Sequence, residues 1–273
     1  MAIITISREL AALGDETAHE LAKQLGYRFV ERSILEEKIK SFGIDGDKLE
    51  KFDERKSSFL ASLSRDGDDY IHFLKTAVLA EASQGNCIFI GRGTGVILQD
   101  IPGVIRAFLT APIEIRIERI RSYFHCDEKR ARHILEQADN NREAFHRYFF
   151  DTKWKDGSNY HLTLNTGSLH PGVCAALIKT MLDKIINDET EKQNSTRIKE
   201  INLGHQIKHH ICYNKKIPIQ FLEILVSGNN VSLFGAAYSQ AVKEEAVLAA
   251  CEIVPGGSIQ SEIRVVEEDS GMP

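Results

Sequence analysis

Several features that mark particular classes of protein are missing from this chain of 273 residues. Its five cysteines lie far apart and form no C-x-x-C pair, so neither a zinc site nor a disulfide framework is expected. The ten histidines are not expected to form a metal site. No apolar run is long enough to span a bilayer, and we expect no secretory signal. These absences predict a cytoplasmic protein with buried, reduced thiols and no metal ligands of its own.

The charge balance excludes one further class. A formal net charge of −5 argues against a general nucleic-acid binder, which needs an excess of lysine and arginine. Hydrophobic residues make up 42% of the chain and charged residues 27%, which are the proportions of an ordinary globular protein. The length allows one large domain or two smaller ones.

Strand-like and helix-like patterns alternate over the first two thirds of the chain. This alternation predicts right-handed crossovers and a parallel sheet with helices on both faces, an α/β fold. The expected strands are 2–6, 27–30, 86–90, 104–110 and 160–165, and the expected helices are 15–25, 32–42, 69–83, 112–123, 127–148 and 172–187.

The pattern changes after residue 187. Residues 188–196 are polar and contain no aliphatic side chain, which is typical of a linker. We therefore predict a large domain over residues 1–187 and a small α+β domain over residues 197–268. The elements expected in the small domain follow the order αββαβ, with a helix at 198–213, strands at 221–226 and 231–234 around a hairpin turn, a helix at 241–251 and a strand at 259–266.

The loop after the first strand has the place of a phosphate-binding loop but not its usual residues. A strand, a tight loop and a helix in succession point backbone N–H groups at a phosphate. A Walker A loop reads G-x-x-x-x-G-K-[ST], whereas residues 7–15 read S-R-E-L-A-A-L-G-D, with no lysine and one glycine. Alanine and leucine oppose the positive φ that glycine permits. Asp15 favours the helix N-terminus and would repel a phosphate there.

The arginines are the other candidates for phosphate contacts, because phosphoryl transfer depends on cations around the phosphates. Arg92 lies between two glycines directly after a buried strand, which favours a ligand contact. Arg8 lies in the first loop, where Glu9 is an alternative partner. For Arg142 and Arg147, on the long charged helix, a ligand contact and a solvated surface both remain open.

Two further arginines are expected to have no ligand. Arg116 and Arg119 are flanked by Glu114 and Glu118 on the helix after Pro112. This pattern favours ion pairs on a solvated helix face.

Five short motifs in register resemble the cytidylate kinase-like family over residues 2–187. They are I-I-T-I-S-R-E at residues 3–9, G-R-G at 91–93, F-L-T-A-P at 108–112, D-N-N-R at 139–142 and L-N-T-G at 164–167. The family belongs to the nucleoside monophosphate kinase branch of P-loop folds. The resemblance implies ATP and Mg²⁺ as partners and a CMP-like monophosphate as the acceptor.

The resemblance also implies roles for particular residues. Arg92 would hold the acceptor phosphate, and a lid helix would present Arg142 and Arg147 for catalysis. The phosphate-binding positions of the first loop would be Ser7, Arg8, Ala11, Ala12, Gly14 and Asp15. The chain departs from the family where G-S-G-G becomes A-A-L-G at 11–14, where Gly93 replaces an aspartate and where Ser7 replaces an acidic residue.

The C-terminal domain carries a second resemblance. Its V-S-L-F-G motif at residues 231–235, after the hairpin, is similar to a BON domain, a module associated with binding phospholipid or other ligands. This implies ligand binding or self-association through residues 197–268.

Two main functions are compatible with these residues. The first is ATP-dependent phosphoryl transfer to a nucleoside monophosphate, with arginines in place of the lysine. The second is a nucleotide sensor without catalysis, whose pocket controls the C-terminal domain. A scaffold that binds no nucleotide is the third alternative.

Overall fold

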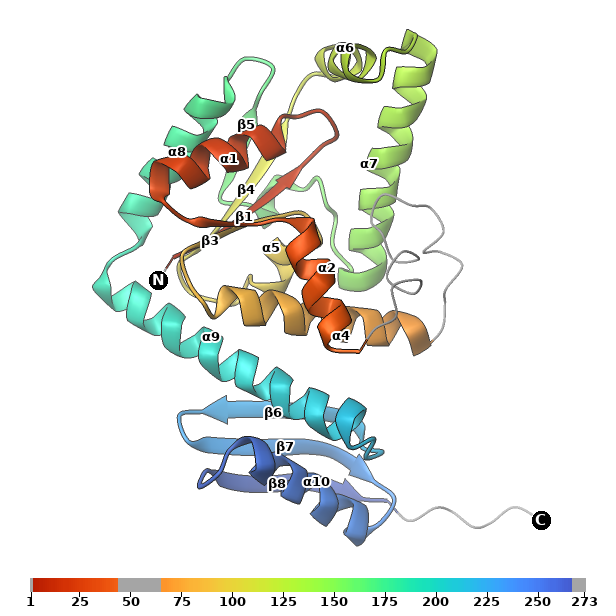
Figure 1. The fold of residues 1–273 in the computed structure, drawn as a ribbon, viewed down its shortest axis with the longest axis vertical. Coiled ribbons are helices and arrows are strands. Elements are labelled where there is room, and N and C mark those ends of the chain that lie inside the picture. Colours follow the sequence, from red (N-terminus) through yellow and green to blue (C-terminus); the bar gives the residue numbers. More distant parts are fainter. Residues whose placement is uncertain (1, 44–64, 267–273) are drawn as a thin grey trace, which may run out of the picture. The chain divides into compact units, whose positions relative to one another are not determined.

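The computed structural model describes residues 2–43 and 65–266 (Figure 1). The chain divides between Ser195 and Thr196 into two compact units. In the described residues, the first unit contains a five-stranded sheet and the second a three-stranded sheet. The predicted fold class, a parallel α/β sheet followed by a small α+β unit, is confirmed. In the same residues, no helix combines the length and the apolar character needed to cross a membrane.

The sheet of the first unit is entirely parallel, with the strand order β2-β3-β1-β4-β5. The central strand β1 lies between β3 and β4, so the chain fills one side of the sheet and then the other. In open α/β sheets, ligands bind beyond the carboxyl ends of the strands at such a switch point. The strands are β1 (Ile3–Arg8), β2 (Arg28–Val30), β3 (Cys87–Ile90), β4 (Val104–Thr110) and β5 (Leu162–Asn165).

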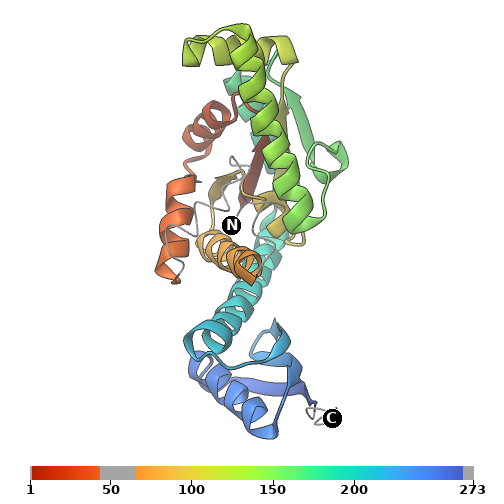
Figure 2. The same ribbon diagram turned by 90° about the vertical axis from the view of Figure 1, so that its right-hand side faces the viewer.

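Helices cover both faces of this sheet (Figure 2). Two of them begin at residues that favour a helix start. Asp127 caps the helix 128–150, because its side chain accepts a 2.7 Å hydrogen bond from Arg130 N, and Pro171 is the first residue of the helix 171–185. The short elements α5 and η2 are not among the predicted ones. The helical elements are α1 (Gly14–Leu25), α2 (Arg32–Ser41), α4 (Arg65–Ala82), α5 (Thr94–Ile97), α6 (Ile113–Phe124), α7 (Glu128–Phe150), η2 (Gly157–Asn159) and α8 (Pro171–Ile185).

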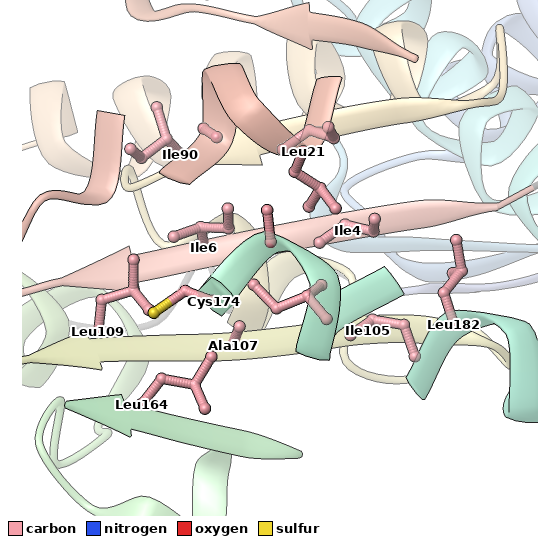
Figure 3. Packing of buried hydrophobic residues seen from close by; sticks show 14 of the residues in the cluster. Ile4, Ile6, Leu21, Ile90, Ile105, Ala107, Leu109, Leu164, Cys174 and Leu182 are labelled. Atoms are coloured by element: carbon pink, nitrogen blue, oxygen red, sulfur yellow. The ribbon is translucent and has the colours of Figure 1, made fainter. Parts of the chain in front are cut away.

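One hydrophobic core lies between the sheet and helices α1 and α8 (Figure 3). Ile4 and Ile6 of β1 point to this face and pack with Leu21 of α1 and Cys174 of α8. All four side chains are fully buried. Burial of one such aliphatic side chain contributes about 1.5–3 kcal/mol. This core fixes the end of β1 and the start of α1, and therefore the loop between them.

The segment 188–196, predicted above to be a linker, is helical. It forms the first part of α9 (Asp188–His209). Asn187 caps this helix, because its Oδ1 accepts a 2.9 Å bond from Thr190 N, and the first turn is acidic. The segment contains no glycine or proline to end a helix. Most of its polar side chains are exposed or half-buried on this helix, and Asn194 is buried.

The second unit has the predicted element order αββαβ. Strands β6 and β7 pair in antiparallel fashion through a turn where Gly228 has φ 57°, and β8 pairs with β7 in parallel. One face of the sheet packs on helix α10, whose N-cap is Ser239. The elements after α9 are the π-helical turn η3 (His210–Asn214), β6 (Gln220–Ser227), β7 (Asn230–Ala237), α10 (Gln240–Ile253) and β8 (Ser258–Val265).

Candidate functional site

Two cavities lie at the carboxyl ends of the central strands of the first unit. The larger cavity, about 450 Å³, lies between the first loop, α1, α2 and the end of β3, and Arg92 lines it. The smaller cavity, about 230 Å³, lies between the first loop, α6 and α7. Arg8 and Asp15 line both cavities. The loop predicted to bind phosphate therefore separates two adjacent spaces.

The first loop adopts left-handed backbone conformations without glycine. Ala11 has φ 60° and Leu13 has φ 54°. This conformation costs a residue with a side chain roughly 1–2 kcal/mol. The sequence indicates that alanine and leucine are unsuited to positive φ. It does not predict that both residues nevertheless adopt positive φ in this loop. Gly14 is needed for another reason, since a Cβ there would lie 2.5 Å from Arg8 Cγ.

Side chains from distant parts of the chain hold this loop. Asp139 Oδ1 accepts a 3.1 Å hydrogen bond from Leu10 N. Arg119 donates to the carbonyl oxygens of Ala11 (2.9 Å) and Thr166 (2.8 Å). The Thr166 hydroxyl in turn donates to Ala12 O at 3.1 Å. These bonds offset the strain of the left-handed residues.

A charged network lies beneath the loop. Arg116 donates to Asp139 Oδ2 at 2.7 Å and lies 3.6 Å from Glu9 Oε2. Lys155 Nζ lies 2.9 Å from Glu9 Oε1 and 3.3 Å from Asp139 Oδ2. Arg142 joins at 3.5 Å from Asp139 Oδ1. Three cations thus surround two carboxylates, and both carboxylates are buried. Such mutual pairing is what allows buried charges to persist.

The network shifts the pKa of two of its members. Burial alone would raise the pKa of Glu9, but hydrogen bonds from Thr110 and Lys155 and the charges of Arg116 and Lys155 lower it overall. Burial alone would lower the pKa of Lys155, but Glu9 and Asp139 raise it overall. Both groups are therefore held in their charged forms.

The prediction that Arg116 and Arg119 lie on a solvated ion-pair face is wrong. Arg116 is buried in the network, and Arg119 holds the loop and lines the smaller cavity. A signal was present in the sequence, because Ile113, Arg116, Ile117 and Ile120 share one helical stripe. Burial lowers the pKa of Arg119, against the opposing charge of Glu16.

The predicted arginines of α7 are placed differently from each other. Arg142 is buried and lines the smaller cavity, and its guanidinium carbon lies 6.0 Å from the Trp154 ring centre. Arg147 is exposed and lines neither of the two cavities. Of the two residues, only Arg142 lies with the loop.

The residues predicted for the first loop also differ in whether they line a cavity. Arg8, Ala11, Ala12, Gly14 and Asp15 all line the smaller cavity. Ser7 is buried at the end of β1, lines neither cavity and forms a hydrogen bond with Tyr160, a residue whose pKa is raised to about 12, chiefly by burial. Five of the six loop residues therefore line one cavity, and Ser7 does not.

The structure explains why residue 93, after Arg92, is a glycine. Gly93 has φ 67°, and a Cβ there would lie 2.2 Å from Cε2 of Phe150. The ring of Phe150 thus takes the space that an aspartate side chain would need. Arg92 itself has φ 57°.

The smaller cavity combines charged and aromatic residues. Its lining includes three arginines (Arg8, Arg119, Arg142) and three acids (Glu9, Asp15, Glu16). The lining also includes Tyr123 and Phe124 at the end of α6, which are 79% and 53% exposed and whose ring centres are 4.9 Å apart. A base can stack on such rings while its phosphates face the arginines.

The donor set for a metal ion is limited. In residues 2–43 and 65–266, no three His, Cys, Asp or Glu side chains converge as a metal cage. Mg²⁺ does not need such a cage, because it is usually held by one or two carboxylates together with substrate phosphates. The exposed carboxylate of Asp15, beside both cavities, fits that requirement.

Comparison with known proteins gives a family match and several fold matches. The model of the cytidylate kinase-like family matches residues 3–168. An uncharacterized protein from Eubacterium ventriosum ATCC 27560 is 21% identical with a TM-score of 0.53, covering 67% of this chain and 99% of that chain. Shikimate kinase from Bacteroides thetaiotaomicron is 14% identical (67% and 98% covered, TM-score 0.42). Deoxyadenosine kinase from M. mycoides is 16% identical (67% and 100% covered, TM-score 0.38). No curated protein matches.

Proposed function

Because this chain belongs to the cytidylate kinase-like family, we propose that its first unit transfers a phosphoryl group from ATP to a nucleoside monophosphate. The observation that carries this proposal is the pair of adjacent cavities. A kinase must hold a donor and an acceptor so that the transferred group lies between them. Arg8 and Asp15, which line both cavities, stand where two such ligands would meet.

The smaller cavity is the proposed site for ATP. Its arginines suit phosphates, and its aromatic rings suit a base. Arg8 and Arg142 neutralise phosphate charge in this proposal, and Arg119 keeps the loop in place. Arg147 takes part only if α7 moves, since it lines neither cavity. The larger cavity, with Arg92, takes the CMP-like acceptor.

Mg²⁺, when bound with ATP, neutralises phosphate charge. Asp15 is the residue that would hold it. In that role the aspartate, which on its own repels a phosphate, would become compatible with one, because the charge of the cation would offset the repulsion.

The second candidate is a nucleotide sensor without catalysis. It is favoured by the three carboxylates that line the smaller cavity and by the absence of a lysine in the first loop. These features reduce the positive potential available to a developing phosphoryl charge. Binding without turnover is the behaviour that this alternative requires.

The decisive experiment compares binding and turnover in the full chain. Calorimetry against ATP and CMP, with and without Mg²⁺, is combined with an assay of ADP formation in the presence of CMP. If the protein transfers a phosphoryl group, the parent forms ADP and Asp15→Asn does not. The control is Glu20→Gln, which removes one carboxylate further along α1 and should still form ADP. ATP binding without ADP formation in the parent identifies the sensor. No binding of either nucleotide would contradict both candidates.

The aromatic pair gives a more specific test of the ATP site. Removing a ring that stacks on a base costs about 1–3 kcal/mol. Tyr123→Ala should therefore weaken ATP binding by that amount and leave the binding of inorganic triphosphate unchanged. Tyr148→Ala, which removes an exposed tyrosine of α7 outside the cavity, is the control. Equal losses for ATP and triphosphate in Tyr123→Ala would contradict base stacking.

We also propose that the second unit is a BON-like module that binds a ligand or a second copy of the chain. Phe221 and Leu225 of β6 support this role, since they are 87% and 60% exposed. Large apolar side chains exposed on a strand are available for contact with a partner.

A further inference from the structure

The larger cavity contains an arginine that already has an anionic partner. The Arg92 side chain is 3% exposed, and its Nη2 lies 2.6 Å from Glu36 Oε1. Its Nη1 donates a 3.0 Å hydrogen bond to the hydroxyl of Tyr70. The guanidinium predicted to hold the acceptor phosphate therefore binds a carboxylate and a phenol of the chain itself.

The same carboxylate oxygen also accepts a hydrogen bond from a second arginine. Arg32 Nε also donates to Glu36 Oε1, and both residues lie on α2, one turn apart. Arg92 follows β3, so two arginines from two elements converge on one oxygen. This is the arrangement in which arginines bind an oxygen of a phosphate.

The three side chains differ in how easily they can leave this arrangement. Glu36 is 23% exposed, whereas Arg92 is 3% exposed. An ionised carboxylate at that exposure can turn into water, but a buried guanidinium can lose its partner only at a large cost in solvation. When an anion enters the cavity, Glu36 is therefore the group that moves.

We propose that Glu36 is a specificity-determining residue that occupies the phosphate position of the larger cavity and competes there with the phosphate of a ligand. The inference rests on the proposed function, in which this cavity takes a nucleoside monophosphate. A phosphate monoester binds only in the fraction of molecules in which Glu36 has turned away, and its apparent affinity falls by that fraction. A ligand without a phosphate does not meet this competition.

The chain offers a matched control for the test. Glu37 follows Glu36 on the same helix and is exposed, outside both cavities. Glu36→Gln and Glu37→Gln remove the same charge from the same helix. The glutamine amide oxygen can still accept hydrogen bonds from the arginines, and the fluorescence of Trp154, the single tryptophan, reports whether the first unit keeps its parent stability.

Calorimetry of the full chain with CMP and with cytidine is the experiment. We expect Glu36→Gln to bind CMP at least about tenfold more tightly than the parent, which is the size of one charge-assisted hydrogen bond. Cytidine binding should be unchanged, and Glu37→Gln should match the parent for both ligands. Equal or weaker CMP binding in Glu36→Gln, or a parallel gain for cytidine, overturns the role of Glu36. If no variant binds CMP at all, the monophosphate site itself is overturned along with this inference.

Discussion

At the scale of single residues, the first loop depends on contacts that compensate for its backbone conformation. Ala11 has φ 60°, so glycine should be at least as stable there as alanine. We expect Ala11→Gly to keep or raise the free energy of unfolding, because relief of roughly 1–2 kcal/mol of strain exceeds the entropy that glycine adds to the unfolded chain. Urea denaturation followed by Trp154 fluorescence measures this.

The control is an alanine-to-glycine change in an ordinary helix. Ala176 is exposed in the interior of α8, where glycine costs about 1 kcal/mol. If Ala11→Gly destabilises the first unit as much as Ala176→Gly does, the left-handed conformation at Ala11 is not the strained one described above.

The network beneath the loop makes a prediction about pH. The pKa of Glu9 is lowered from its ordinary value of 4.5, so its charged form stabilises the folded state above that pH. This stabilisation is lost as the pH falls through the lowered pKa. Glu9→Gln should therefore cost about 1.5–3 kcal/mol at pH 7, and this difference should shrink below pH 4.5. Unfolding free energies of both proteins at intervals from pH 7 down to pH 3 provide the measurement. A difference that stays constant over this range would mean that the charge of Glu9 does not stabilise the fold.

At the scale of elements, helix α9 contains a buried amide without a hydrogen bond. Asn194 is fully buried, and neither its Oδ1 nor its Nδ2 has a partner among the described residues. An unsatisfied buried polar group costs about 1–3 kcal/mol. We expect Asn194→Leu, which has a similar volume, to raise the free energy of unfolding of the first unit.

The neighbouring residue supplies the comparison for this prediction. Gln193 is exposed, so Gln193→Leu should change the free energy of unfolding by less than about 0.5 kcal/mol. The same fluorescence-detected denaturation applies to both variants. A loss of stability in Asn194→Leu would imply that the amide is satisfied, for example by water.

At the scale of the whole molecule, the position of the boundary between the units can be tested by truncation. A Cβ at Gly103 would lie 2.8 Å from Ile186 Cδ1 and 3.0 Å from Thr190 Cγ2, so the start of α9 contacts the loop before β4. A chain ending at Ser195 should therefore unfold cooperatively, at a denaturant midpoint close to that of the parent's Trp154 transition. A chain ending at Asn187 lacks Thr190 and should have a lower midpoint. The boundary is wrong if the longer truncated chain fails to unfold cooperatively.

Self-association through the second unit is tested by sedimentation. The full chain and the chain ending at Ser195 are compared, each with and without ATP. We expect the full chain to form a larger species and the shorter chain to remain monomeric, because the exposed side chains of β6 belong to the second unit. Nucleotide shifts this equilibrium only if the two sites are energetically coupled. Monomers in all four samples would leave self-association without support.

The sequence was sufficient to predict the fold because its signals are local. Alternating strand and helix patterns placed the five parallel strands, and the hairpin turn placed β6 and β7. The candidate site was predicted only in part. The loop and Arg92 follow strand ends, which a pattern can locate. Arg119 was assigned to the surface because its role depends on Thr166, which is distant in the sequence.

The helical structure of residues 188–196 was not predicted, for a different reason. A polar stretch without aliphatic residues has the composition of a linker, and also that of an exposed helical turn. The absence of glycine and proline and the capping Asn187 favoured the helix.

The bond between Asp139 and Leu10 has a consequence for how such proteins are found. Searches for phosphate-binding loops look for glycine and lysine within one short stretch, and by that criterion this chain would be passed over. Here the loop conformation is held by an aspartate 129 positions away, and side chains in the loop need not be glycine. A descriptor that pairs a short loop with a distant acidic residue, as on α7 here, would detect proteins whose loops depart from the glycine and lysine pattern in the same way.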